Sequence, residues 1–213
     1  MGAPPVFDDA FRSRLAELFA WRRDVRRFTA RPLPAGALEA LVRGAAAAPS
    51  VGFSQPWRFV EVASPARRRA VVAEFERANA RAAAAYDDAA SASYRTLKLA
   101  GLREAAAHLA VFCDEATPVG RGLGRASMPE MLAYSVVLAV HTLWLSARAN
   151  GIGVGWVSIL DPLRVATLLD VEPSWSLVAY LCVGYPAEEH VEREIARAGW
   201  ERERDDGARL HRR

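Results

Sequence analysis

Residues 22–28 read Arg-Arg-Asp-Val-Arg-Arg-Phe and directly follow residues 8–21, whose apolar side chains recur at helical spacing. Arg22, Arg23 and Arg26 place three guanidinium groups within five residues. Such groups donate paired hydrogen bonds to phosphate oxygens and keep their charge at neutral pH. The segment can therefore bind a phosphate, although on its own it is better explained as a solvated basic turn.

A second informative stretch is residues 49–57, which read Pro-Ser-Val-Gly-Phe-Ser-Gln-Pro-Trp. The proline that follows Gln55 restricts the backbone there, so the side-chain amide of Gln55 is held in a limited set of orientations. A fixed amide can hydrogen-bond the edge of a flat heterocycle, because it offers both donors and an acceptor. A loop that only leads into the next strand explains these residues equally well.

A third stretch, residues 151–158, carries three alternating glycines and lets the backbone approach a flat ligand closely. The spacing is not Gly-x-Gly-x-x-Gly, and the glycines follow a predicted helix instead of opening one. A Rossmann dinucleotide site is therefore disfavoured. The glycines of residues 120–124 fail the same test.

Composition limits the class of protein. The 213 residues suit one domain, and the 52% hydrophobic and 25% charged residues are ordinary for a globular chain. Among the 28 basic residues, Lys98 is the single lysine. The net charge is only +3 and the acidic residues are spread along the chain, which argues against a nucleic-acid-binding surface.

The cysteines and the apolar stretches indicate where the protein works. Cys113 and Cys182 lie in apolar runs, which predicts buried thiols in a reducing compartment. The four histidines show no paired metal-ligand spacing, so we expect no metal. Residues 1–9 lack the pattern of a signal peptide, and we expect a cytoplasmic protein. We interpret the apolar residues 131–149 as a helix buried in a soluble dimer and not as a membrane span.

Helical and strand patterns alternate along the chain, which predicts an α+β or α/β fold. The expected helices are residues 8–21, 35–48, 66–85, 129–150 and 162–169, and the expected strands are residues 57–62, 108–113, 151–159 and 175–183. Residues 86–94 are less regular and are a candidate for a mobile lid. We expect one domain over residues 1–200. The chain should be extended from Glu188 onward, and residues 201–213 are charged enough to be partly disordered.

The motifs become informative in combination. The basic segment at residues 22–26, the loop at residues 49–57, the glycine-rich residues 151–158 and the closing Val-Gly-Tyr-Pro at residues 183–186 resemble the nitroreductase superfamily in order and spacing. The resemblance extends from Phe11 to Trp200. It implies an α/β sandwich in which helices flank a mixed central sheet. It also implies a homodimer with exchanged C-terminal extensions that binds flavin mononucleotide (FMN) at its interface.

Residues 22–28 are similar to the 5,6-dimethylbenzimidazole synthase branch of this superfamily, since Asp24 stands where ordinary nitroreductases usually carry Ser. Residues 101–104, 108–115 and 155–162 are similar to the same branch. Phe53 departs from the general superfamily pattern, because many flavin reductases have Asn at this place. That departure puts one side-chain contact to the flavin in doubt, but not the fold.

The branch consumes reduced FMN as a substrate. With molecular oxygen it fragments the flavin into 5,6-dimethylbenzimidazole, the lower ligand of cobalamin, and erythrose 4-phosphate. The resemblance therefore implies this reaction here, with a separate flavin reductase that supplies reduced FMN. The alternatives are an FMN-dependent NAD(P)H nitroreductase or flavin reductase, which would recycle its flavin, and an FMN-storage module without catalysis.

The resemblance also implies the site residues. Asp24 is the expected catalytic group for proton transfer, and Ser158 is the expected catalytic hydroxyl near the reactive nitrogen of the ring. The expected FMN-binding residues are Arg22, Arg23, Asp24, Val25, Arg26, Ser50, Ser54, Gln55, Leu99, Gly155, Ser158 and Arg197.

Overall fold

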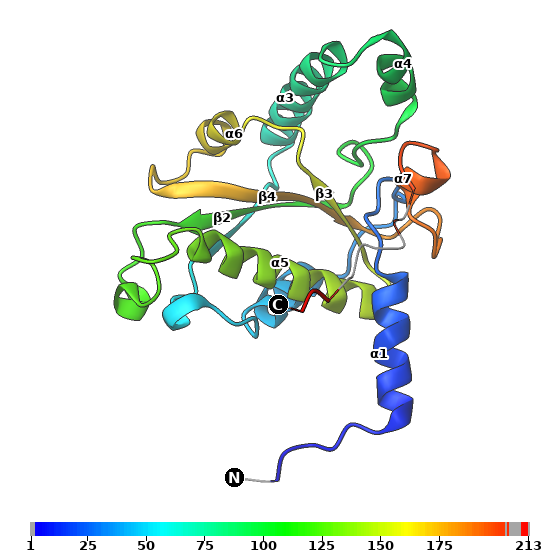
Figure 1. Ribbon diagram of the computed structural model, residues 1–213. Coiled ribbons are helices and arrows are strands. Elements are labelled where there is room, and N and C mark those ends of the chain that lie inside the picture. The colour runs from blue at the N-terminus through cyan, green and yellow to red at the C-terminus, as the bar shows by residue number, and fades with distance from the viewer. Residues whose placement is uncertain (1–2, 203, 205–209, 213) are drawn as a thin grey trace.

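A computed structural model of the chain describes residues 3–202, 204 and 210–212. A sheet forms the middle layer, α5 covers one face, and α3 and α6 cover the other (Figure 1). The helices are α1 (Asp9–Trp21), α2 (Ala37–Ala45), α3 (Pro65–Ala84), α4 (Asp88–Thr96), α5 (Met131–Ala149), α6 (Pro162–Leu169) and α7 (Glu194–Arg197), with 3-10 turns η1 (Val51–Phe53) and η2 (Val119–Gly122). The strands are β1 (Trp57–Glu61), β2 (Ala107–Asp114), β3 (Gly153–Val157) and β4 (Trp175–Gly184).

The sheet has the order β1-β2-β4-β3, and every neighbouring pair of strands is antiparallel. The expectation of a mixed sheet is therefore wrong for these four strands. Parallel pairing among the described residues is limited to one isolated bridge, between Asp24 and Val154. The chain reverses direction between β1 and β2 through the excursion that carries α3 and α4. It reverses again between β3 and β4 through α6.

Helix α5 lies against one face of the sheet, because its apolar residues recur three and four positions apart. The buried ones are Leu132, Val136, Ala139, Val140, Leu143, Trp144 and Ala147. Tyr134, Val137 and Leu138 lie on the opposite side of the helix and stay exposed. Among the described residues, α5 is the one helix long and apolar enough to cross a membrane. One protomer thus buries only one face of α5.

The other face of the sheet packs against α3 and α6. Val71 of α3 and Val165 of α6 are fully buried there against Phe112 and Tyr180 of the sheet. Phe28, from the segment after α1, joins the same cluster with 6% of its surface exposed. The arginine-rich segment is therefore anchored in the core at its C-terminal end.

Helix α1 begins where Asp8 accepts a hydrogen bond from the Phe11 amide, at 2.8 Å. It has no buried residue and projects away from the body of the protomer (Figure 1). The aromatic side chains of Phe11 and Phe19 remain exposed on it. A helix with an uncovered apolar side needs a further surface to pack against.

Two expectations about loops are corrected. The chain after Glu188 is not extended throughout, because residues 194–197 form α7, whose Glu194 carbonyl accepts from the Ala198 amide. Residues 86–94 mostly belong to α4, while their motion as a lid stays a prediction. The expected partial disorder of residues 201–213 stays a prediction, and residues 203, 205–209 and 213 of this tail lie outside the described residues. The expectation of buried thiols is confirmed, since Cys113 and Cys182 are free and buried.

His108 makes a testable contribution to stability. Its Nδ1 lies 2.9 Å from the Tyr180 hydroxyl, and both side chains are fully buried. Burial lowers the pKa of His108 to about 4. Above pH 6.5 the imidazole is neutral in both states, so it adds no pH dependence. Below pH 6.5 the unfolded chain takes up the proton first, and stability falls until the folded pKa is reached.

We therefore predict that the free energy of unfolding loses about 3 kcal/mol between pH 6.5 and pH 4 through His108 alone. Urea unfolding across this range, for the wild type and for His108→Asn, measures the effect. Asn keeps a polar group near the position of Nδ1 but does not titrate. Equal pH slopes for the two proteins would contradict the assignment.

Candidate functional site

The arginine-rich segment after α1 runs along the outer edge of β3. The Val25 amide donates to the Val154 carbonyl at 3.0 Å, and the Trp144 indole N–H donates to the Arg23 carbonyl at 3.2 Å. These contacts fix the segment between the sheet and α5. Backbone bonding to β3 explains why a basic stretch next to a helix takes one defined path.

Asp24 is the centre of this segment. Its Oδ1 accepts a hydrogen bond from the Trp156 amide and its Oδ2 accepts one from Arg26 Nε, both at 2.8 Å. Arg26 also donates to the Lys98 carbonyl at 3.0 Å. The Asp24 side chain is 30% exposed, so the carboxylate is oriented by two donors and still open to a ligand. Such a group can accept or return a proton.

Arg22 supplies a positive charge beside this carboxylate. Its guanidinium lies 4.9 Å from the centre of the Trp144 ring, and no ion pair to it is found among the described residues. Partial burial lowers the pKa of Arg22, and nearby Asp24 opposes that shift. The group still carries its charge at neutral pH. It is therefore a suitable ligand for an anion.

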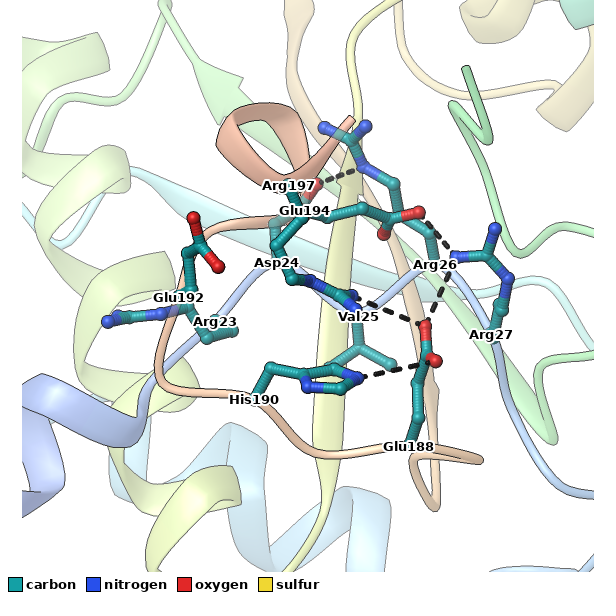
Figure 2. Close-up of a pocket in the computed structure, with 10 residues that line it drawn as sticks. All are labelled: Arg23, Asp24, Val25, Arg26, Arg27, Glu188, His190, Glu192, Glu194 and Arg197. Carbon is teal, nitrogen blue, oxygen red and sulfur yellow. Dashed lines mark hydrogen bonds and ion pairs between the residues drawn. The ribbon is translucent and has the colours of Figure 1, made fainter. Parts of the chain in front are cut away.

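A cavity lies between the arginine segment and the chain that leads into α7 (Figure 2). Its lining residues are Arg23, Asp24, Val25, Arg26, Arg27, Glu188, His190, Glu192, Glu194 and Arg197. The structure thus brings Arg197 to the same cavity as the residues 23–26 of the segment, as expected. Arg197 is exposed and lies 3.5 Å from the Glu188 carboxylate.

The carboxylates around this cavity were not predicted. Glu188 accepts from Arg27 at 3.2 Å, and Glu194 pairs with the same guanidinium. A hydrogen bond from His190 and the nearby arginines lower the pKa of Glu188. The acidic residues come between the Val-Gly-Tyr-Pro stretch and Arg197, which was predicted to bind phosphate. This proximity in sequence was the signal that could have indicated them. Arg23 is held here too, since its Nε donates to the Val191 carbonyl at 2.5 Å.

The loop residues of the predicted site lie elsewhere. Ser50 accepts from the Gln55 amide at 3.1 Å, and the neighbouring Val51 amide donates to Ser135 at 3.0 Å. Ser135 lies nine residues before Trp144 on α5, which separates the two positions by roughly 13 Å along the helix. Within one protomer the structure therefore does not bring Ser50, Ser54 and Gln55 to the arginine segment.

Two side chains of that loop have unusual surroundings. The Ser54 side chain is buried, and its hydroxyl makes no hydrogen bond within the described part of the chain. Phe53 has a positive φ of 55° and is 74% exposed. The aromatic ring of Phe53 therefore contributes to the surface of the protomer and not to its core.

Gly155 lies opposite the arginine segment. A Cβ atom at this position would lie 2.1 Å from the Val25 carbonyl oxygen. The position requires glycine because the segment packs directly on the strand. The expected close approach of this backbone to a flat ligand stays a prediction.

Ser158 and Leu99 lie at the ends of elements next to this segment. Ser158 is exposed and follows β3, two residues after the Trp156 amide that Asp24 binds. Leu99 is partly buried and follows Lys98, whose carbonyl accepts from Arg26. Each residue is therefore close in the chain to a backbone group that bonds Asp24 or Arg26. Neither residue lines the cavity of Figure 2.

A search of the described residues for groups of three or more His, Cys, Asp or Glu able to hold a metal ion finds none.

Comparison with known proteins assigns the fold. Residues 19–185 match the model of the nitroreductase family. The chain belongs to the nitroreductase family. It is 54% identical to a 5,6-dimethylbenzimidazole synthase of Rhodospirillum rubrum, over 96% of this chain and 97% of that protein. It is 45% identical to a 5,6-dimethylbenzimidazole synthase of Rhodobacter capsulatus, over 92% and 94% of the two chains.

Solved structures agree with this assignment. An oxidised iodotyrosine deiodinase bound to FMN and 3-iodo-L-tyrosine superimposes with a TM-score of 0.69 and 26% identity, over 83% of this chain and 91% of the other. The expected nitroreductase-like fold is thereby confirmed, while its exchanged C-terminal extension stays a prediction.

The contact between Gly155 and Val25 generates a prediction. Gly155→Ala should destabilise the protein by about 1–3 kcal/mol or more, because the added methyl overlaps the Val25 carbonyl. Gly44→Ala is the matched control: it lies in α2, where a Cβ meets Ser146 at an ordinary 3.6 Å. That change should stabilise by about 0.5–1 kcal/mol, since Ala favours helix. Thermal unfolding of both variants checks the opposite signs.

Proposed function

We propose that this chain is a 5,6-dimethylbenzimidazole synthase. It takes reduced FMN and molecular oxygen and forms 5,6-dimethylbenzimidazole and erythrose 4-phosphate. The observation that carries the proposal is the 54% identity, along nearly the whole chain, to a synthase of that name. The position of Asp24 supports it, because a carboxylate stands at the point where the arginine segment meets β3.

The residues present fit FMN. Arg22, Arg26 and Arg197 provide fixed positive charge for a phosphate, which guanidinium groups bind with paired hydrogen bonds. Arg22 in particular has no ion pair among the described residues. The Ser54 hydroxyl has no hydrogen-bond partner among the described residues, and we propose it as a further donor to the polar ring edge.

In the proposed mechanism the arginines bind the phosphate and thereby fix the position of the ring. The isoalloxazine supplies the electrons that oxygen accepts. Asp24 holds or moves a proton at its carboxylate, while Arg26 and the Trp156 amide keep that carboxylate in place. Val25 and Leu99 cover the ring with apolar surface and exclude water, which favours a directed reaction over simple reoxidation.

Ser158 and Gln55 complete the proposed contacts to the ring. The Ser158 hydroxyl is exposed at the end of β3 and donates near the reactive nitrogen. The Gln55 amide binds the polar edge of the ring, and Ser50 fixes the Gln55 backbone through its hydroxyl. Arg23 and Gly155 contribute mainly by shaping the segment that carries Asp24.

We propose that the working unit is a homodimer. The loop that carries Ser50, Ser54 and Gln55 contacts α5 at Ser135. The arginine segment of the same protomer contacts α5 at Trp144, so the two do not meet. We infer that these loop residues reach a flavin held by Arg22 from a second copy, with Gln55 of the partner subunit at the ring. The exposed apolar side of α5 and the projecting α1 offer the surface for that assembly.

A separate flavin reductase supplies the reduced FMN in the cytoplasm. Neither a membrane nor a nucleic acid is a partner. The alternative, an NAD(P)H-dependent nitroreductase or flavin reductase, would recover its flavin intact. It would take hydride from NAD(P)H in steady turnover. Recovery of the flavin therefore distinguishes the two reactions.

The first experiment binds reduced FMN without oxygen, admits air, and measures small molecules by mass spectrometry. The wild type should form 5,6-dimethylbenzimidazole. Asp24→Asn should form it about 10²–10⁴-fold more slowly, because Asn cannot accept the proton. Binding of reduced FMN should change little, since the arginines are untouched. Full activity of Asp24→Asn would show that Asp24 is only an ion-pair partner.

The second experiment tests the dimer. Leu138→Glu places a charge on the exposed side of α5 and should give a monomer that binds FMN poorly. Leu163→Glu is the matched control, because Leu163 is 81% exposed on α6, across the sheet. Sedimentation and FMN titration measure both properties. A wild-type chain that sediments as a monomer at micromolar concentration and binds FMN would refute the shared site.

A further inference from the structure

Glu74 is a buried carboxylate that none of the steps above uses. It lies on α3 with 4% of its surface exposed, on the side of the helix that faces α6. A buried ionised carboxylate is costly unless donors surround it. The arrangement of those donors therefore shows what Glu74 does in the fold.

The two oxygens of Glu74 have different partners. Oε1 accepts a hydrogen bond from the Asp161 amide at 3.3 Å. Oε2 lies 3.2 Å from Arg164 Nε, and Arg77 pairs with the same carboxylate. Asp161 in turn caps α6 by accepting from the Leu163 and Arg164 amides. One carboxylate on α3 thus holds the first residues of α6 and the loop that leads to them.

That loop carries Ser158. At its start, the Trp156 amide donates to Asp24, and at its end, the Asp161 amide donates to Glu74. Val157 is buried in the core between them, with 4% of its surface exposed. The exposed Ser158 therefore lies on a short span whose two ends are fixed by two carboxylates from different parts of the chain.

Stability alone is a weak explanation for a buried glutamate. An apolar side chain of similar size at such a position is often as stabilising as a buried ion pair, because both charges lose their hydration. An apolar side chain would not accept from the Asp161 amide, however. What Glu74 adds over Met or Leu is a fixed position for residue 161 relative to α3.

We propose that Glu74 is a positioning residue for Ser158: it anchors the end of the 156–161 span and so fixes where the Ser158 hydroxyl meets the flavin. This inference rests on the proposed function for its effect on the reaction. Its structural half, the anchoring of the span, stands on the described contacts alone. Misplacing a group by about 1 Å lowers a directed reaction by up to about 100-fold, so the effect should be large.

The first arm of the test is independent of the reaction. Hydrogen exchange of peptides that cover residues 157–164 is compared in the wild type, in Glu74→Met and in Glu76→Met. Glu76 is the matched control, because it lies on the same helix in an exposed pair with Arg103. Exchange should rise about tenfold in Glu74→Met, as expected for loss of a hydrogen bond to a charged group, and should stay unchanged in Glu76→Met.

The second arm measures how reduced FMN is partitioned after oxygen is admitted. We expect Glu74→Met to lower the ratio of 5,6-dimethylbenzimidazole to reoxidised FMN about 10- to 100-fold. The competing route is balanced, since reduced FMN and oxygen give FMN and hydrogen peroxide. Glu74→Gln keeps an acceptor for the Asp161 amide and should restore a ratio close to wild type. If Glu74→Met does not fold, Glu74→Asp, which withdraws the carboxylate by one methylene, replaces it in both arms.

The double variant Glu74→Met/Ser158→Ala decides whether the effect passes through Ser158. In the Ser158→Ala background, Glu74→Met should cause no further fall in the product ratio, because coupled residues are not additive. A full additional loss, or unchanged exchange at residues 157–164, would overturn the inference. If the wild type forms no 5,6-dimethylbenzimidazole, the proposed function fails, and the exchange arm still decides the anchoring by itself.

Discussion

The carboxylate of Asp24 is the interaction on which the site depends. It binds a backbone amide of β3 and the guanidinium of Arg26, so it joins the sheet to the basic segment. Without a side chain that accepts both hydrogen bonds, the basic segment would be held to this edge strand by backbone bonds alone. With it, Arg26 is held in place beside Arg22, whose guanidinium has no ion pair among the described residues.

Much of the fold could be predicted from the sequence, because its elements have strong periodicity. The long helix over residues 131–149 and the strands at residues 107–114 and 175–184 are rich in apolar residues, and their bounds came within a few residues. The direction of the strands was not predictable in the same way. Periodicity gives the faces of a strand, while its partner and direction depend on contacts far apart in the chain.

The candidate site was predictable only in part, and for a physical reason. Asp24 and its neighbouring arginines are contiguous in the chain, so their chemistry could be read directly. Glu188 and Glu194 line the same cavity, where the chain turns into α7. The charged composition of this stretch did not indicate a helix there. The loop with Gln55 contacts α5 at Ser135 and the arginine segment contacts it at Trp144, and the sequence pattern gives no such separation in space.

The contact between Gly155 and the Val25 carbonyl has a consequence for how such a site can change in evolution. Two stretches of main chain touch there without a side chain between them. The place of Asp24 is therefore determined by backbone hydrogen bonds and by the absence of a side chain at position 155, so a substitution of Gly155 would disturb it. Relatives whose side chains differ in the surrounding layers can in this way keep the same backbone path beside β3.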